Sequence, residues 1–132
     1  MPRFPSREWA EEYCKKLNES EGYRRSARGW VWPILFKVER PEGASPGFLL
    51  KLNNGVCEGV EWFDDARSAD APYILSARLE DWLDIINGKV NPVTAIVRRK
   101  LKLEKGEIGM IMRYPLAALE MVRAAQKVET IV

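Results

Sequence analysis

Histidine is missing from this sequence. Its absence removes the usual general base, the Ser-His and Cys-His nucleophile pairs, and the commonest zinc ligand. No Walker loop and no GxGxxG pattern is present, so a phosphate-binding loop has no sequence support. Glu80 and Asp84 can share a helix face, but no base or metal partner accompanies them, and we interpret them as a solvated face. We therefore expect a protein that is not an enzyme, with no catalytic residue, no metal and no cofactor.

Long hydrophobic runs are also missing. None approaches the roughly 18 residues that a membrane-spanning helix needs. The N-terminus, MPRFPSREWAEEYCKK, has no apolar stretch typical of a secretory signal. A chain of 132 residues fits one domain, so we expect a single domain over residues 1–132 and a cytoplasmic location.

Cysteine is scarce, with only Cys14 and Cys57 in the chain. They are far apart in the sequence and do not form a CxxC pair. In a cytoplasmic protein we expect both to be reduced, with Cys14 on the apolar face of a helix.

The net charge is only +2, and the charged residues are dispersed along the chain. A balance this small does not indicate a nucleic-acid partner. Two basic clusters are open to two interpretations, solvated faces beside helix ends or surfaces that contact anionic head groups or a ligand carboxylate. They are Arg24, Arg25 and Arg28, and then Arg98, Arg99, Lys100 and Lys102.

The first half of the sequence predicts a helix followed by a β meander. Ser6 is suited to cap a helix that ends near residues 18–22, and a less regular basic segment follows to Gly29. Alternating apolar residues predict strands, with a hairpin turn at Asn53-Asn54-Gly55 and with Val56, Val60 and Trp62 on one face of the third strand. The strands cover residues 30–38, 48–52, 56–63 and 73–77.

The second half predicts helices around one further strand. A helix over 78–86 ends at Gly88, and Asn91-Pro92 has the residues typical of a helix N-terminus. In that next helix Val93, Ile96 and Val97 are expected to face inward. A strand over 100–103 precedes a helical tail over 107–128, broken near Tyr114-Pro115. This order predicts an α+β fold: a five-stranded, mostly antiparallel sheet with one face covered by helices.

One stretch carries a family resemblance. It contains, in order, Asp81-Trp82, Gly88-Lys89, Val90, Asn91-Pro92, Ala95 and Lys100-Leu101-Lys102-Leu103. With this constellation, EDWLDIINGKVNPVTAIVRRKLKL resembles the sterol carrier protein type 2 (SCP-2) domain. The resemblance implies an apolar tunnel between the sheet and the helices. It also implies binding of a sterol, fatty acid, acyl-CoA, phospholipid or isoprenoid, which is carried without being transformed.

Within that resemblance, residues on the apolar faces are candidates to line the tunnel, although ordinary core is the commoner role for such residues. The methionines suit a surface that accepts variable ligands, or serve as adaptable core filler. The candidates are Trp32, Phe36, Leu50, Leu52, Trp62, Trp82, Ile86, Ile96, Met110, Met112 and Met121. Arg98, Arg99 and Lys102 are candidates to pair with a ligand head group.

Three functions follow as hypotheses. The first is a non-enzymatic carrier of a small hydrophobic ligand, with transient contact at a membrane surface. The second is an accessory module that presents an apolar groove to a partner enzyme of lipid or quinone metabolism. The sequence also leaves a homodimer open. The third, an enzyme that uses carboxylates or Cys57, has the least support.

Overall fold

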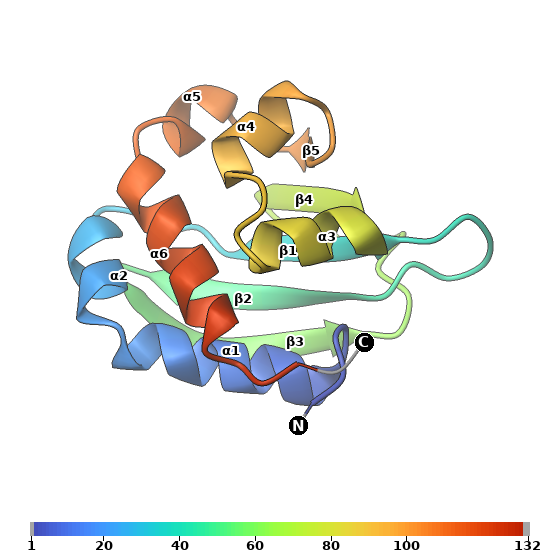
Figure 1. Ribbon diagram of the computed structural model, residues 1–132, viewed down its shortest axis with the longest axis horizontal. Coiled ribbons are helices and arrows are strands. Elements are labelled where there is room, and N and C mark those ends of the chain that lie inside the picture. The colour runs from blue at the N-terminus through green and yellow to red at the C-terminus, as the bar shows by residue number, and fades with distance from the viewer. Residues whose placement is uncertain (1, 131–132) are drawn as a thin grey trace.

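The computed structural model describes residues 2–130, and Figure 1 shows its helices and strands in order. The strands are β1 (Ile34–Glu39), β2 (Gly47–Asn53), β3 (Val56–Phe63), β4 (Tyr73–Arg78) and β5 (Lys102–Lys105). The helices are α1 (Arg7–Glu19), α2 (Glu21–Ser26), α3 (Leu79–Ile86), α4 (Pro92–Val97), α5 (Ile108–Ile111) and α6 (Pro115–Gln126).

The five strands form one sheet in the order β3-β2-β1-β4-β5. β1 and β4 are parallel and the other pairs are antiparallel, so the predicted mostly antiparallel sheet is confirmed. Directly paired residues lie on the same face of a sheet. The register therefore places one row of apolar side chains across all five strands: Trp62, Phe48, Phe36, Leu75 and Leu103.

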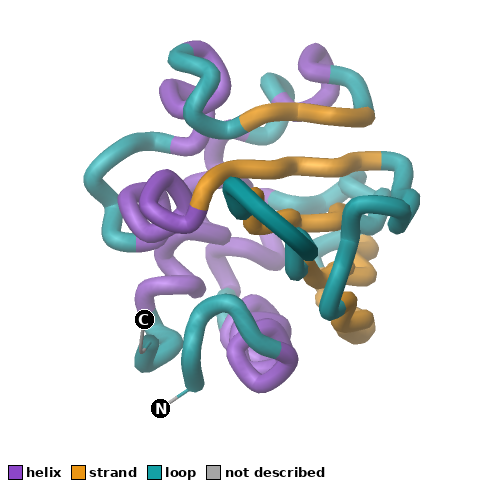
Figure 2. Tube along the Cα trace, turned by 90° about the vertical axis from the view of Figure 1, so that its right-hand side faces the viewer, coloured by secondary structure: helices purple, strands orange, loops and turns teal. Residues whose placement is uncertain are grey.

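Helices cover the face of the sheet that carries this row, as predicted (Figure 1). Figure 2 shows the layers from the side, with most of the purple helices to the left of the orange strands. On the opposite face, Leu35 and Ile74 pack against Ala66 and Ala71 of the loop between β3 and β4. The second face is therefore covered in part by a loop.

The N-terminal helix begins where the sequence predicts, because the Ser6 hydroxyl accepts a hydrogen bond from Trp9 N (3.0 Å). The segment after it differs from the prediction, since residues 21–26 form the short helix α2 instead of an irregular stretch. Ser20 explains the difference: it ends α1 and also caps α2, accepting a hydrogen bond from Tyr23 N (3.0 Å).

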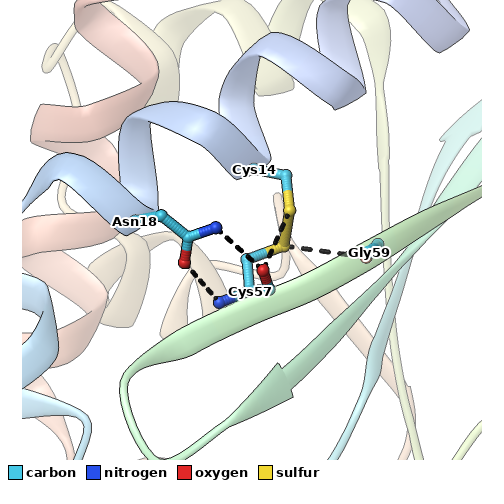
Figure 3. The surroundings of a disulfide bond; sticks show 4 residues. All are labelled: Cys14, Asn18, Cys57 and Gly59. Atoms are coloured by element: carbon cyan, nitrogen blue, oxygen red, sulfur yellow. Dashed lines mark hydrogen bonds between the residues drawn. A yellow bond between two sulfur atoms is a disulfide. The ribbon is translucent and has the colours of Figure 1, made fainter.

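A disulfide joins α1 to β3 (Figure 3), so the prediction of two reduced cysteines is wrong. The Cα atoms of Cys14 and Cys57 are 5.5 Å apart. Folding brings them together because α1 lies along β3, the edge strand of the sheet (Figure 1). The Asn18 side-chain amide also links α1 to β3 at this point. It accepts a hydrogen bond from Cys57 N (2.8 Å) and donates one to Cys57 O (2.9 Å).

The prediction that Val56, the first residue of β3, faces inward is wrong. Leu50 pairs with Val60 but Leu52 pairs with Cys57, so a bulge shifts the register between them. The shift buries Cys57 and leaves Val56 40% exposed.

Two predictions near α4 also need correction. Val97 does not face inward: it is 69% exposed, and Ala95 is the fully buried residue of this helix. The last strand starts two residues later than predicted, because the N–H groups of Lys100 and Leu101 still donate to Ala95 O (2.9 and 3.1 Å). The helix break near Tyr114-Pro115 is confirmed, and it separates α5 from α6.

Candidate functional site

An apolar cavity of about 130 Å³ lies between the sheet and the helices. Its floor is the helix-covered face of the sheet. The strand residues that line it are Ile34, Phe36 and Val38 of β1, Phe48 and Leu52 of β2, and Leu75 of β4.

The opposite wall comes from the helices. α3 contributes Trp82, Ile85 and Ile86, and α4 contributes Pro92, Val93 and Ile96. α6 contributes one face with small side chains, Ala117, Ala118 and Ala125, beside Met121 and Val122. Because alanine reaches only a short way from the helix axis, this face leaves space over the strands.

Aromatic side chains from the N-terminal region close one side of the cavity: Phe4, Trp9, Tyr13, Tyr23 and Trp30. The polar atoms of several lining aromatics bind groups of the protein itself. Trp30 Nε1 donates to Trp32 O and Trp82 Nε1 donates to Lys37 O, both at 2.7 Å, and the Tyr13 hydroxyl donates to Met121 O (3.0 Å). These hydrogen bonds satisfy the buried donors without a ligand.

The wall contains no Asp, Glu, Lys or Arg side chain. Burial raises the pKa of the Tyr13 phenol, with a smaller effect from neighbouring Tyr23, and burial also raises the pKa of Tyr23. Both phenols therefore stay neutral at physiological pH. Within residues 2–130, no group of three or more Cys, Asp or Glu side chains is placed to hold a metal ion. The arrangement is chemically suited to bind apolar molecules.

Lining residues that are only partly buried show where the cavity approaches the surface. Most of the wall on the sheet and α3 is buried, whereas Val93 and Ile96 of α4 and Met121 and Val122 of α6 are half-buried. Leu75 is also half-buried, although it belongs to β4, which has a strand on each side. Ile111 and Tyr114, which lie between α4 and α6 in the chain, are half-buried as well, so the least buried part of the wall runs from α4 to α6.

The structure gathers one group of the sequence-predicted lining residues around the cavity: Phe36, Leu52, Trp82, Ile86, Ile96 and Met121. Contact of these residues with a ligand stays a prediction.

The other predicted lining residues do not border the cavity. Leu50 is fully buried in the core, while Trp32 packs on Trp30 with ring centroids 5.1 Å apart. Trp62 lies on edge strand β3, where its indole N–H donates to Asp64 Oδ1 (2.8 Å). Met110 packs against the core without reaching the cavity, and Met112 is 43% exposed.

The three predicted head-group residues separate into two places. Arg98 and Arg99 follow the last residue of α4 and are exposed, one turn or less from the lining residue Ile96. Lys102 pairs with Ser76 in the sheet register and forms an ion pair with Glu39 (3.2 Å). Since Leu103 and Leu75 occupy the helix-covered face, Lys102 points to the opposite face, away from the cavity.

Sequence reasoning missed much of the aromatic and alanine wall. Helical spacing puts Trp9 and Tyr13 on one face of α1 with Cys14, but nothing in that spacing shows that they border a space. The small residues of α6 carried the useful signal, because a buried face of alanines opposite aromatic strand residues leaves volume unfilled.

Residues 9–115 match the model of the SCP-2 sterol transfer family, which is most of the chain. The chain belongs to this family. A crystal structure of sterol carrier protein 2 is similar, with a TM-score of 0.87 and 33% identity over 94% of this chain and 98% of that one. A conserved hypothetical protein of Thermus thermophilus, described as possibly a sterol carrier protein, is also 33% identical, with a TM-score of 0.86 over 96% of this chain and 90% of that one.

A solution structure of palmitated SCP2L2 from Aedes aegypti shares the fold at 14% identity, with a TM-score of 0.60 over 83% of this chain and 90% of that one. No curated protein matches the chain. The SCP-2 domain is a lipid-binding carrier fold, so membership places the protein among lipid-binding proteins in general. Among residues 2–130, no helix is long and apolar enough to cross a membrane.

Proposed function

We propose that the protein binds a lipid with a long acyl chain in the cavity and carries it without transforming it. The observation that carries the proposal is the cavity wall: it has no charged side chain, and its indole N–H groups are held by hydrogen bonds within the protein. A site of this kind gains free energy from burying hydrocarbon and offers no group for acid, base or nucleophilic chemistry.

The energetics support an acyl chain. Each buried methylene contributes about 0.8 kcal/mol, so a long chain gains on the order of 10 kcal/mol before the costs of association. Leaving a cavity of about 130 Å³ unfilled would cost about 3 kcal/mol, at about 24 cal/mol per Å³. Filling it recovers part of that cost.

The cavity is small for a whole acyl chain, since pockets for drug-sized ligands are about 300–1,000 Å³. Loading therefore requires part of the wall to move outward. α6 is suited to this movement, because its fully buried residues are alanines and its first residue is Pro115, where the helical tail is interrupted. The Aedes aegypti SCP2L2 that shares the fold is palmitated, which supports an acyl chain as the ligand.

A charged head group would lie at the least buried part of the cavity wall, from α4 to α6. Arg98 and Arg99, which are exposed at the end of α4, are our candidates to pair with a carboxylate or phosphate there. Lys102 is not, because it is paired with Glu39 on the other face of the sheet.

Native mass spectrometry of freshly purified protein, followed by solvent extraction and lipid analysis, tests the proposal. The expected result is a bound species with the mass of an acyl lipid, or, for a protein purified empty, saturable binding of a fluorescent fatty acid. A protein that carries no lipid and binds neither fatty acids nor acyl-CoA would refute it.

We further propose that residues 1–132 act as one lipid-binding domain, and we keep the cytoplasm as the predicted compartment. The disulfide bears on this point, because such bonds persist in oxidising compartments and in the intracellular proteins of hyperthermophiles. Trapping free thiols at the moment of cell lysis measures the redox state of Cys14 and Cys57. Two free thiols would support a reducing cytoplasm, and an intact bond, as in this structure, would count against that location.

A further inference from the structure

Exposed large apolar side chains gather on α4, α5 and the start of α6. They are Val97 (69% exposed), Leu116 (66%), Ile108 (43%) and Met112 (43%), and we name them the α4–α6 patch. Figures 1 and 2 both place α4 and α5 at the same end of the molecule. Elsewhere in residues 2–130, the other exposed large apolar residues are the single positions Val31 and Val56.

The elements that carry the patch also line the cavity. Ile96 borders the cavity while the next residue, Val97, faces solvent, and Ile111 borders it while Met112 faces solvent. α5 is thus apolar on both sides over its sequence IGMI. A helix that is apolar all round is normally buried, so this end of the fold has an outer apolar surface as well as an inner one.

Basic side chains follow the patch residues closely in the chain. Arg98, Arg99 and Lys100 follow α4, Arg113 follows α5, and all four are exposed. None of the four forms an ion pair with a carboxylate of residues 2–130, whereas Lys102 and Lys105 on neighbouring β5 are both paired. The acidic residue nearest in sequence to Arg98, Arg99 and Lys100 is Glu104, which forms an ion pair with Lys37 (2.9 Å), and the one nearest to Arg113 is Glu107, the N-cap of α5.

We propose that the α4–α6 patch docks on the surface of an anionic lipid bilayer. Apolar side chains enter the interfacial region while flanking Arg and Lys side chains meet the lipid phosphates, and the two contributions add. The cations would also suit a nucleic acid, but the four exposed aliphatic side chains would not, so a bilayer is the better fit. In this orientation the least buried part of the cavity wall, from α4 to α6, faces the bilayer. That role in loading rests on the proposed function, but docking itself is measured separately.

Flotation of the full chain with lipid vesicles tests the proposal. Phosphatidylcholine vesicles are compared with vesicles that also contain phosphatidylglycerol. The expected result is strong binding to the anionic vesicles and weak binding to the neutral ones. Lys100→Gln/Arg113→Gln should lower partitioning to anionic vesicles about thirtyfold, since each cation near the surface contributes about 1 kcal/mol.

Matched controls separate the patch from general charge and hydrophobicity. Arg25→Gln/Arg28→Gln removes the same charge from the other basic cluster and should leave partitioning within about twofold. For the apolar term, Val97→Thr/Leu116→Gln is compared with Val31→Thr/Val56→Thr, and only the first pair should weaken binding, by about tenfold. All these positions are exposed and outside the cavity wall, so circular dichroism should show an unchanged fold.

Equal losses in the patch variants and their controls would overturn the proposal, as would binding that does not depend on lipid charge. The proposal would also be overturned if the protein bound no vesicles and instead self-associated in sedimentation velocity, with Val97→Thr/Leu116→Gln abolishing the self-association. That result would identify the patch as a protein interface. Fatty-acid titration in solution distinguishes the two proposals. A protein that binds vesicles but no fatty acid refutes the proposed function and leaves docking intact, and the converse result refutes docking alone.

Discussion

Two neighbouring alanines of α6 allow the cavity to be tested without any knowledge of the natural ligand. Ala125 lines the cavity, whereas Ala124 is equally buried but does not. Ala124 lies one turn beyond Glu120, whose carboxylate is against Gly22 of α2. This side of α6 is therefore packed closely against α2. We predict opposite effects of the same substitution, Ala→Leu, at these two positions.

The magnitudes follow from space and contact area. Leucine adds three carbon atoms, each contributing about 0.8 kcal/mol when buried, so Ala125→Leu should change the free energy of unfolding by about 0 to +2 kcal/mol after some strain. At Ala124 there is no space to fill, and overpacking costs about 1–3 kcal/mol. The free energies of unfolding of the two variants should therefore differ by at least about 1 kcal/mol.

Urea unfolding of both variants measures this difference, and a fluorescent fatty-acid titration measures its consequence. In Ala125→Leu the larger side chain would occupy the volume of about three ligand methylenes, which corresponds to about a fiftyfold weaker affinity for the fatty acid. Ala124→Leu should keep its affinity wherever it remains folded. If Ala125→Leu destabilises as much as Ala124→Leu, the space beside α6 is already filled and the reasoning is refuted. Unchanged affinity in a stabilised Ala125→Leu would place the ligand elsewhere.

Two further predictions concern stability. Reduction of the Cys14–Cys57 bond, or the double substitution Cys14→Ser/Cys57→Ser, opens a loop with a sequence separation of 43. The free energy of unfolding should fall by about 2–4 kcal/mol, which calorimetry would record as a Tm lower by roughly 10 °C. An unchanged Tm would show that the bond contributes little to stability. The raised pKa values of Tyr13 and Tyr23 predict a loss of stability at alkaline pH. Their contribution is fully present below the unfolded-state pKa of about 10 and falls as pH rises above it, because the unfolded chain then releases protons that the folded chain keeps. Urea unfolding across this range should show the decline, and Tyr13→Phe/Tyr23→Phe should flatten it; an equally steep decline in the double variant would assign the effect to other groups.

Local sequence patterns predicted the elements well where a local interaction decides them. The Ser6 and Asn91 side chains cap α1 and α4 through hydrogen bonds to residues two or three positions away, so the sequence contains all the necessary information. The hairpin turn is a similar case, because Asn54 and Gly55 adopt the positive φ angles that an Asn-Gly pair favours. The motif of residues 80–103 identified the family for the same reason, as it consists of caps, turns and a short strand close together in the chain.

The errors occur where distant segments meet. The reduced state expected for Cys14 and Cys57 followed from composition and compartment, but their pairing follows from the packing of α1 along edge strand β3. The exposure of Val56 follows from the register between β2 and β3, which a bulge shifts. Alternation within one strand cannot reveal a bulge, because the extra residue is defined only against its partner strand.

The candidate site shows the same division. The sequence by itself determined that the strands and helices would supply apolar faces, and it identified Phe36, Trp82 and Ile96 among them. Only the tertiary structure decided that these faces leave a cavity and that Leu50 and Trp62 are not part of it. The physical reason is that unfilled volume belongs to no single segment. It arises from the distance between the strand face and the short alanine side chains of α6, and that distance exists only once the sheet and the helices have packed together.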